Sequence, residues 1–178
     1  MRYFDELKKS MEWLASQEDT YFVGQAVEVP GTAMYNTVKD IEISKRLELP
    51  VFEDTQLGIS IGMSLTGKRV VSIFPRWNFL ICATNQLVNH LDKLPIITDG
   101  EVTPNLIIRT SVGSERPLFP GHQHIGNMTE GYRKLLSSVE IIELIDAEDI
   151  FKSYQKAFKR KDGKSTILVE FGDFYNEK

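Results

Sequence analysis

The amino-acid sequence predicts an α/β protein with a mostly parallel six-stranded sheet and helices on both faces. Six short apolar runs recur along the chain, and most of them are continuously apolar rather than alternating, which is typical of strands covered on both sides. Helical patterns separate these runs, and strands that alternate with helices favour parallel pairing through right-handed crossovers. Without internal repeats or linkers, residues 1–178 are expected to form one domain.

The expected strands are Tyr21–Val27, Leu49–Phe52, Arg69–Phe74, Asn105–Thr110, Val139–Leu144 and Thr166–Phe171. The expected helices are Tyr3–Ser16, Thr37–Leu47, Thr55–Thr66, Asn78–Leu91, Asn127–Leu136 and Ala147–Lys159. The first helix has apolar residues at positions 4, 7, 11 and 14, which form one helical face. Gly67 ends the third helix, and Asp146 is suited to begin the last helix as its N-cap.

Composition restricts the class of function. The net charge is −4 and the isoelectric point is near 5.5, so no basic field favours nucleic acid as a partner. The single cysteine, Cys82, excludes an intramolecular disulfide and is typical of a reducing compartment. The N-terminal segment carries both acids and bases, unlike a signal peptide, and no apolar run reaches the roughly 20 residues of a membrane span. We therefore expect a cytoplasmic protein.

Residues 111–126, SVGSERPLFPGHQHIG, depart from the alternating pattern. The segment contains three glycines, two prolines and two of the three histidines, and it directly follows an expected strand. A loop of this length is commonly functional, and ligands of open α/β sheets bind beyond the carboxyl ends of the strands. Glu53 also follows an expected strand, so we expect the histidine loop and this acid to face one cleft.

Most local catalytic signatures are missing from the sequence. It contains no GxxxxGK[ST], no GxGxxG after a strand, no HExxH and no GxSxG. His122 and His124 have no ligand-rich neighbourhood beyond Glu115, so no metal site is expected. Ser111 or Ser114 could form a triad with a histidine and an acid, but nothing marks either as a nucleophile.

The residues alone leave structural explanations open at each remaining position. Glu53 at a helix start would interact with the helix dipole, worth roughly 0.3–1 kcal/mol, although Asp54 or Thr55 could serve as the cap. Trp77 and Phe79 are of a type more often found in a core than against a ligand. The spacing of Gly58 and Gly62 is typical of a close-packing helix face.

Taken in order, six segments resemble the pyrimidine-binding (Pyr) domain of thiamine diphosphate enzymes. They are YFVGQAVEVPG, VFEDTQLGISIGMSLTGKRVVSIF, FPRWNFLICATNQLVNHLDK, PNLIIRTSVG, HQHIG and ILVEFGDFY. The resemblance covers nearly the whole chain. It is nearest to the beta subunit of two-chain 2-oxo acid dehydrogenase first components, with transketolase more distant. It implies the thiamine diphosphate-binding fold of the Pyr type.

The resemblance gives the acid at the helix start a chemical role. Glu53 falls on the family's catalytic glutamate, which shares a proton with the cofactor's pyrimidine ring and so lets the exocyclic nitrogen act as the internal base. Val51, Phe52 and Leu57 are expected to shield Glu53 from water, and Leu57 also falls among the cofactor-binding residues. The resemblance thus explains why a glutamate stands before the expected cap residues Asp54 and Thr55.

Further site residues follow from the same resemblance. Trp77 falls on an aromatic position that packs against the pyrimidine, with Phe79 beside it. His124 falls on the active-site loop histidine and is expected to reach the substrate; its alternative is a loop histidine exposed to water.

The substrate side is expected to include Arg109, His122, His124 and Gln25. Arg109 either anchors a substrate carboxylate or phosphate or braces the loop. Gln25 and Ala26 stand where the family has an acidic pair, so substrate choice is expected to differ.

The second half of such an active site has no counterpart in the sequence. The family holds the diphosphate through Mg²⁺ with a GDG followed by an asparagine pair, and neither TDGEVTPN nor FGDFYNEK matches that motif. The resemblance therefore implies a separate chain that carries the diphosphate-binding domain and holds Mg²⁺, in an alpha2beta2 hetero-oligomer that is active only when complete. The family's additional C-terminal domain is not present in the sequence, so a smaller enzyme than a large dehydrogenase complex is expected.

The reaction expected of this pair is 2-oxo acid decarboxylation, carboligation or ketol transfer with thiamine diphosphate. One alternative is a non-catalytic regulatory or scaffold subunit that retains the fold. Another is a flavodoxin-like or nucleotide-binding α/β domain with an unrelated ligand.

Overall fold

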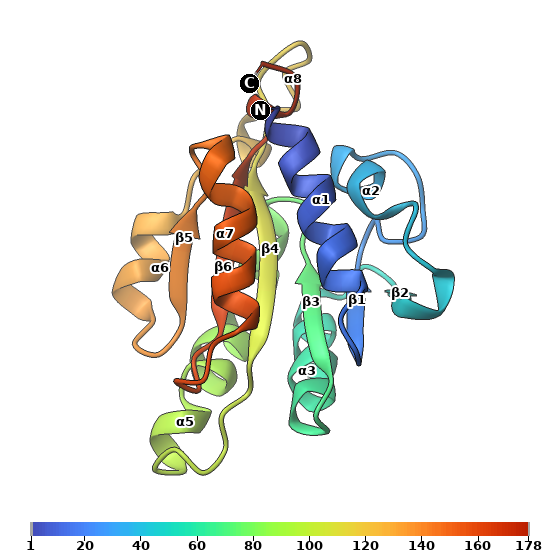
Figure 1. Cartoon of the computed structure of the whole chain (residues 1–178). Coiled ribbons are helices and arrows are strands. Elements are labelled where there is room, and N and C mark those ends of the chain that lie inside the picture. The colour runs from blue at the N-terminus through green and yellow to red at the C-terminus, as the bar shows by residue number, and fades with distance from the viewer. Residues whose placement is uncertain (1, 178) are drawn as a thin grey trace.

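The computed structural model describes residues 2–177, in which strands and helices alternate along the chain (Figure 1). The strands are β1 (Thr20–Gly24), β2 (Arg46–Glu48), β3 (Arg69–Ile73), β4 (Leu106–Val112), β5 (Glu140–Glu143) and β6 (Thr166–Phe171). They form one six-stranded sheet in the order β2-β1-β3-β4-β6-β5, and every neighbouring pair is parallel. The predicted α/β class and parallel sheet are confirmed.

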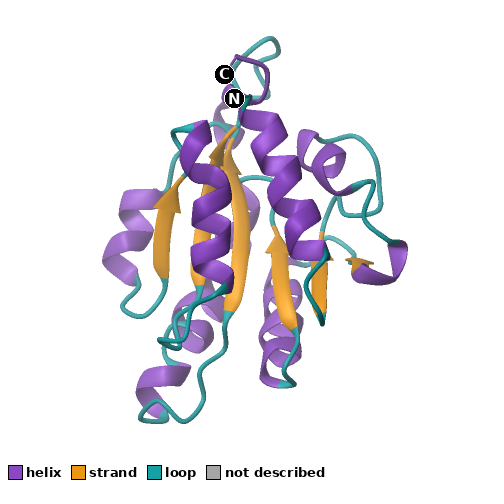
Figure 2. Cartoon of the chain, in the orientation of Figure 1, coloured by secondary structure: helices purple, strands orange, loops and turns teal. Residues whose placement is uncertain are grey.

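Helices cover both faces of the sheet (Figure 2). One face carries α1 (Tyr3–Ala15), α2 (Ala33–Val38), α7 (Ala147–Phe158) and α8 (Phe174–Glu177). The other face carries α3 (Glu53–Leu65), α4 (Trp77–Leu80), η2 (Ile81–Ala83), η3 (Gln86–Leu91) and α6 (Thr129–Leu135). Shorter elements are η1 (Ile43–Lys45), α5 (Leu94–Ile97) and η4 (His122–His124).

Each face of the sheet has its own apolar core. Neighbouring residues of β4 show the alternation, because Ile107 packs with α1 and α7 whereas Ile108 packs with α3 and α4. Both side chains are buried, as the continuous apolar run in the sequence predicts for a parallel strand covered on both faces.

Two predicted elements near the start of the chain are wrong. Residues 49–52 are irregular, and the strand that pairs with β1 is Arg46–Glu48. The expected helix Thr37–Leu47 is instead the end of α2, the single turn η1 and this short strand. The sequence ISKRLE has helix-compatible residues, but pairing with β1 supplies hydrogen bonds that outweigh a weak local preference. Pro50 has no amide hydrogen to extend the strand.

A third predicted helix, Asn78–Leu91, is divided. Its residues form the short α4, a 3₁₀ turn at η2 and a π-helical segment at η3. In the described part of the chain, no helix combines the length and apolar character that crossing a bilayer requires.

Polar contacts fix α3 against the sheet. Gln56 donates from Nε2 to the carbonyl oxygen of Ile73 at 2.9 Å and to Ser72 Oγ at 3.3 Å, and all three groups are buried. Ser60 Oγ lies 2.9 Å from the same hydroxyl of Ser72. Because these bonds connect α3 to β3, they set where the helix begins relative to the carboxyl ends of the strands.

Candidate functional site

The strand order creates a crevice between β1 and β3. From β1 the chain passes to β2 on one side and then returns to β3 on the other, so the connections diverge at this point. Open parallel sheets bind ligands outside the carboxyl ends of strands at such a switch point. Here β1 ends at Gly24 and β3 ends at Ile73, so the residues that follow them lie at the expected binding position.

Glycine is required at the end of β1. Gly24 has φ of +142°, and a Cβ placed there would come within 2.3 Å of the Ile73 carbonyl oxygen and 2.5 Å of Gln56 Nε2. Both contacts are far inside van der Waals separation. The absence of a side chain therefore allows the β1 and β3 backbones and α3 to meet at this edge.

A carboxylate holds the loop after β1. Both oxygens of Glu48, at the end of β2, accept backbone N–H bonds: Oε1 from Ala26 at 3.0 Å, and Oε2 from Val27 and Glu28 at 2.7 Å each. Ala26 takes a positive φ of 59°. Charge-assisted bonds to three amides order this loop, which forms one wall of the crevice.

A pocket of about 360 Å³ lies at this switch point. Its lining residues are Gln25, Ala26, Val29, Pro30, Thr32, Glu48, Val51, Pro75, Arg76 and Phe79. They come from the loop after β1, the segment after β2 and the segment after β3. Of the predicted site residues, the pocket wall includes Gln25 and Phe79. Gln25 is buried, and its Nε2 has no hydrogen-bond partner in the described residues.

Glu53 is the first residue of α3 and lies two residues after Val51 of the pocket wall. Its side chain is 8% exposed, and its carboxyl group has no hydrogen-bond or ion-pair partner among the described residues. The N-cap is Phe52, with no side-chain cap bond, so the predicted capping by Asp54 or Thr55 is wrong. Asp54 instead accepts a bond from Gln86 at 3.3 Å.

The three residues expected to shield Glu53 differ in their exposure. Leu57, one turn later in α3, is fully buried in the apolar core beside the sheet. Val51 and Phe52 are 65% and 68% exposed, so these residues do not exclude water from Glu53 in the chain described. Their apolar side chains are available for contact with another surface.

Trp77 and Phe79 have different environments although they are two residues apart. Trp77 is 1% exposed and stacks on Tyr132, with ring centroids 5.1 Å apart and planes 17° apart. Its indole N–H has no described partner. This burial leaves no exposed ring face on Trp77, which argues against the expected contact with the pyrimidine. Phe79 provides the aromatic wall of the pocket.

The histidine loop reaches the same region through His124. Its Nδ1 lies 3.1 Å from Asn78 Oδ1, and its ring lies near that of Phe79, with centroids 6.1 Å apart. The loop is seated on Gly113, where an added Cβ would come within 2.1 Å of the His124 carbonyl oxygen. His122 is exposed and packs edge-on against Phe119, so the two histidines do not act as a pair.

Arg109 is buried on the opposite face of the sheet. Its Nε and one terminal nitrogen donate to the Glu170 carboxylate, the latter at 3.0 Å, and its other terminal nitrogen donates to Thr37 Oγ1 at 2.7 Å. Tyr154 donates to the same carboxylate at 2.8 Å, and Tyr175 also donates to it.

This network favours the second of the two alternatives for Arg109, in which it braces the structure. Burial by itself would lower the pKa of Arg109, but the neighbouring Glu170 carboxylate raises it above the ordinary value. Burial and the same carboxylate raise the pKa values of Tyr154 and Tyr175 well above their ordinary value. With its donors engaged and no solvent exposure, Arg109 braces the fold, which argues against a contact with substrate.

Arg76 is a site residue that the sequence reasoning missed. It follows β3 directly and lines both the crevice pocket and a second pocket of about 230 Å³. The second pocket is lined by the ends of β4 and β6 and by α8, and its members include Ser111, Ser114 and Asn176. The available signal was a charged residue directly after an apolar strand in a parallel sheet.

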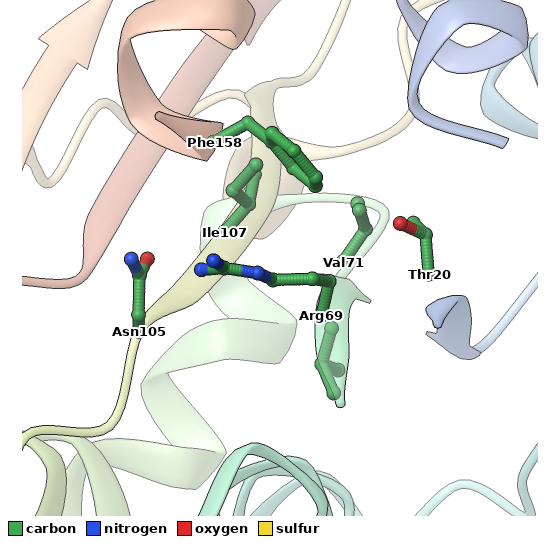
Figure 3. A pocket seen from close by; sticks show the side chains of 7 residues that line it. Thr20, Arg69, Val71, Asn105, Ile107 and Phe158 are labelled. Carbon is green, nitrogen blue, oxygen red and sulfur yellow. The ribbon is translucent and has the colours of Figure 1, made fainter. Parts of the chain in front are cut away.

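A third hollow lies at the opposite, amino edge of the sheet and is not part of this site (Figure 3). It holds only about 10 Å³, and Thr20, Arg69 and Asn105 surround it. The guanidinium of Arg69 lies 5.3 Å from the centre of the Phe158 ring. Across the described residues, no group of three or more His, Cys, Asp or Glu side chains is arranged to hold a metal ion.

Comparisons with known proteins agree with this geometry. No family model matches the chain. The chain is 25% identical over 98% of its length to the pyruvate dehydrogenase E1 component subunit beta of Gracilaria tenuistipitata var. liui. It is 26% identical over 97% of its length to the subunit of the same description in Porphyra purpurea. The chain spans about half the length of these curated relatives, 54% and 49% respectively.

Solved structures share the fold. One, described as a split gene transketolase in an inactive beta4 tetramer, has a TM-score of 0.72 over 96% of this chain and 51% of its own, at 12% identity. Another, described as a putative thiamin diphosphate-dependent enzyme from Mycobacterium smegmatis, has a TM-score of 0.67 over 98% of this chain and 31% of its own, at 16% identity. The resemblance predicted from the sequence is confirmed: the chain is similar in sequence to pyruvate dehydrogenase E1 beta subunits and has the fold of transketolase-like thiamine diphosphate enzymes.

Proposed function

We propose that this chain is the pyrimidine-binding subunit of a two-chain thiamine diphosphate enzyme. The observation that carries the proposal is Glu53 at the carboxyl edge of the sheet, which is only 8% exposed and whose carboxyl group has no hydrogen-bond or ion-pair partner among the described residues. A largely buried carboxyl group without a hydrogen-bond partner is unfavourable unless a ligand or another chain supplies one. The similarity to pyruvate dehydrogenase E1 beta subunits supports thiamine diphosphate as that ligand.

Residues that line the crevice, together with Glu53 two positions beyond its wall residue Val51, suit the cofactor's pyrimidine. Glu53 would share a proton with a ring nitrogen, Phe79 would pack against the ring, and the unpartnered amide of Gln25 would donate to a polar group beside it. When bound, thiamine diphosphate supplies a nucleophilic carbon that its own aminopyrimidine activates. The chain contributes a proton-sharing acid and an apolar wall that orients the ring, while His124 adds a proton donor near Phe79.

A second chain would complete the site. We propose that it holds the diphosphate through Mg²⁺ and that the two chains form an alpha2beta2 assembly. The exposed apolar side chains of Val51 and Phe52, beside Glu53, support a surface that a partner covers. The split transketolase of the same fold is described as inactive in its beta4 form, which also supports this arrangement. The reaction class proposed is 2-oxo acid decarboxylation, carboligation or ketol transfer.

The test is reconstitution with a partner chain that carries the GDG motif. The complex is assayed with thiamine diphosphate and Mg²⁺ on 2-oxo acids and ketose phosphates. Because a positioned acid contributes about 10²–10⁴-fold, Glu53→Gln should lower turnover by at least about 100-fold while the complex still forms. Asp54→Asn is the matched control and should retain turnover, because Asp54 contacts Gln86 rather than the crevice. Full activity of Glu53→Gln would refute the proposal. Absence of any cofactor-dependent thermal stabilisation would favour a scaffold subunit.

A further inference from the structure

Arg76 lies between the two pockets at the carboxyl edge of the sheet. Thr32, Pro75 and Arg76 belong to the walls of both, so Arg76 borders the crevice of about 360 Å³ and the pocket of about 230 Å³. It is half-buried, and its guanidinium has no hydrogen-bond or ion-pair partner among the described residues. Burial lowers the pKa of Arg76.

An arginine in this setting calls for an anion. The guanidinium remains charged at any physiological pH, and taking it partly out of water without a counter-charge is unfavourable. A planar fork of N–H donors matches the oxygens of a carboxylate or a phosphate in a bidentate arrangement. Among the described residues no such group pairs with Arg76, and Glu48 on the same crevice wall accepts from backbone amides instead, so the missing partner is expected to be a ligand.

The stem of Arg76 is held in place by close packing. A Cβ added at Gly113 would lie 3.3 Å from Arg76 Cδ and much nearer the His124 backbone, so glycine at this position lets both segments pack together. Ser111 donates from Oγ to the Pro75 carbonyl oxygen at 2.7 Å, which fixes the residue before Arg76. A fixed stem lowers the conformational entropy lost when the guanidinium binds an anion.

The two sides of Arg76 differ in character. On the crevice side the wall is largely apolar, with Phe79, Val29 and Val51. On the other side the lining is mainly polar and includes Ser114 and Asn176. A ligand that reacts in the crevice and carries an oxyanion at its far end would place that oxyanion at Arg76.

Other arginines near the site already have partners. Arg109 is committed to Glu170 and Thr37. Arg116, which also lines the second pocket, lies 3.8 Å from the carboxylate of Asp173. Of these three arginines, Arg76 is thus the one whose guanidinium has no anionic partner among the described residues.

We propose that Arg76 binds the oxyanion end of the substrate, either a carboxylate or a phosphate monoester, and thereby selects anionic substrates. Its identification as a substrate contact rests on the proposed function, whereas anion binding by Arg76 does not. The experiment is therefore a binding titration on the full chain without cofactor or partner. Inorganic phosphate and pyruvate are the two probes, and sodium chloride at matched ionic strength corrects for general salt effects.

The readout is the Nε–Hε signal of Arg76 in heteronuclear NMR, which Arg76→Gln identifies by its disappearance. We expect at least one probe to give a saturable shift of this signal. Backbone amide signals around the second pocket should follow the same binding curve. In Arg76→Gln the affinity measured from these amide signals should fall at least tenfold, since a charge-assisted bond contributes about 1.5–3 kcal/mol. Saturation by phosphate alone points to a phosphorylated substrate, and saturation by pyruvate alone points to a 2-oxo acid.

Arg69→Gln is the matched control, because Arg69 is an exposed arginine at the opposite edge of the sheet, and it should bind as the parent does. If Arg76→Gln does not fold, Arg76→Lys is the second variant, because lysine keeps the positive charge but lacks the planar pair of donors of a guanidinium. Arg76→Lys should bind the anion measurably but more weakly than the parent does. The proposal is overturned if neither anion saturates the Arg76 signal, or if Arg76→Gln binds as tightly as the parent. If Glu53→Gln keeps full turnover in the reconstituted complex while Arg76 still binds anions, only the proposed cofactor role of the chain is refuted.

Discussion

Arg109→Met tests whether Arg109 stabilises the fold rather than contacting substrate. The substitution removes a guanidinium that is fully buried and donates to the Glu170 carboxylate and to Thr37. Glu170 would keep the bonds from Tyr154 and Tyr175 but lose its counter-charge. Breaking a buried ion pair from one side costs about 3–5 kcal/mol, because the remaining charge is left uncompensated.

That cost is measurable in a protein of this size. For a chain of 150–250 residues, each kcal/mol shifts the midpoint of thermal unfolding by about 2–4 °C, so Arg109→Met should lower it by about 6–20 °C. Urea unfolding of the single variants Arg109→Met and Glu170→Gln and of the double variant completes a cycle. We expect a coupling free energy of at least about 2 kcal/mol, because the second substitution removes the charge that the first leaves unpaired.

The outcome also separates bracing from binding. At a temperature where Arg109→Met is folded, its affinity for phosphate or pyruvate should equal that of the parent, unlike Arg76→Gln. Additivity of the two single substitutions within about 0.5 kcal/mol would refute the coupled network. Loss of anion affinity in folded Arg109→Met would return Arg109 to the substrate site.

Three further predictions concern the crevice and its support. Gly24→Ala should cost at least about 2 kcal/mol in urea unfolding, because φ is +142° and the Ile73 carbonyl lies within 2.3 Å of the new Cβ. The helical control Gly62→Ala, with open space around its Cβ, should gain up to about 1 kcal/mol. Burial alone would raise the pKa of Asp92, but bonds from Lys93 and from the backbone N–H groups of Ser137 and Ser138 hold it below the ordinary value. The stability that the ionised Asp92 contributes is therefore present above about pH 4 and is lost as the pH falls through its lower pKa in the folded protein. In urea titrations the parent's free energy of unfolding should exceed that of Asp92→Asn by about 1–3 kcal/mol near neutral pH. This difference should shrink toward pH 2. In the reconstituted complex, Phe79→Leu should weaken thiamine diphosphate binding about 2–12-fold in calorimetry, because Phe79 lines the crevice. Trp77→Phe should leave the affinity unchanged, because Trp77 stacks on Tyr132 in the core. Equal losses of affinity in the two variants would instead place both rings against the cofactor.

Local pattern predicted the elements that pack strongly. Long apolar runs and amphipathic periods identified β4, β6, α1 and α7, because each of these elements buries a continuous run or a complete face. Prediction failed at Arg46–Glu48, where the strand has three residues and its pairing with β1 lies more than twenty residues away. A short edge strand has too little pattern of its own, so the partner strand decides its position.

The same division holds within the candidate site. The sequence singled out Glu53, Phe79 and His124 from motif order, and the fold brings the latter two into ring contact beside the crevice. The sequence could not distinguish the environments of Trp77 and Phe79, because both are aromatic residues next to Asn78. Only the folded helix α4 shows that Trp77 is buried in the core. The sequence singled out Arg109 and not Arg76 for a related reason: a charged residue in an apolar strand signals importance but does not show which face its side chain takes.

The sequence by itself thus determined the α/β class, the order of the main elements and the resemblance to a pyrimidine-binding domain, because these depend on patterns that local chemistry enforces. Tertiary structure alone decided which arginine is paired and which has a guanidinium without a partner among the described residues. That distinction depends on Glu170, Tyr154 and Tyr175, which meet Arg109 across more than forty residues of sequence, and on two loops that meet at Arg76. Partners distant along the chain leave no local pattern, so their effect on a charge becomes visible only when the sheet brings them together.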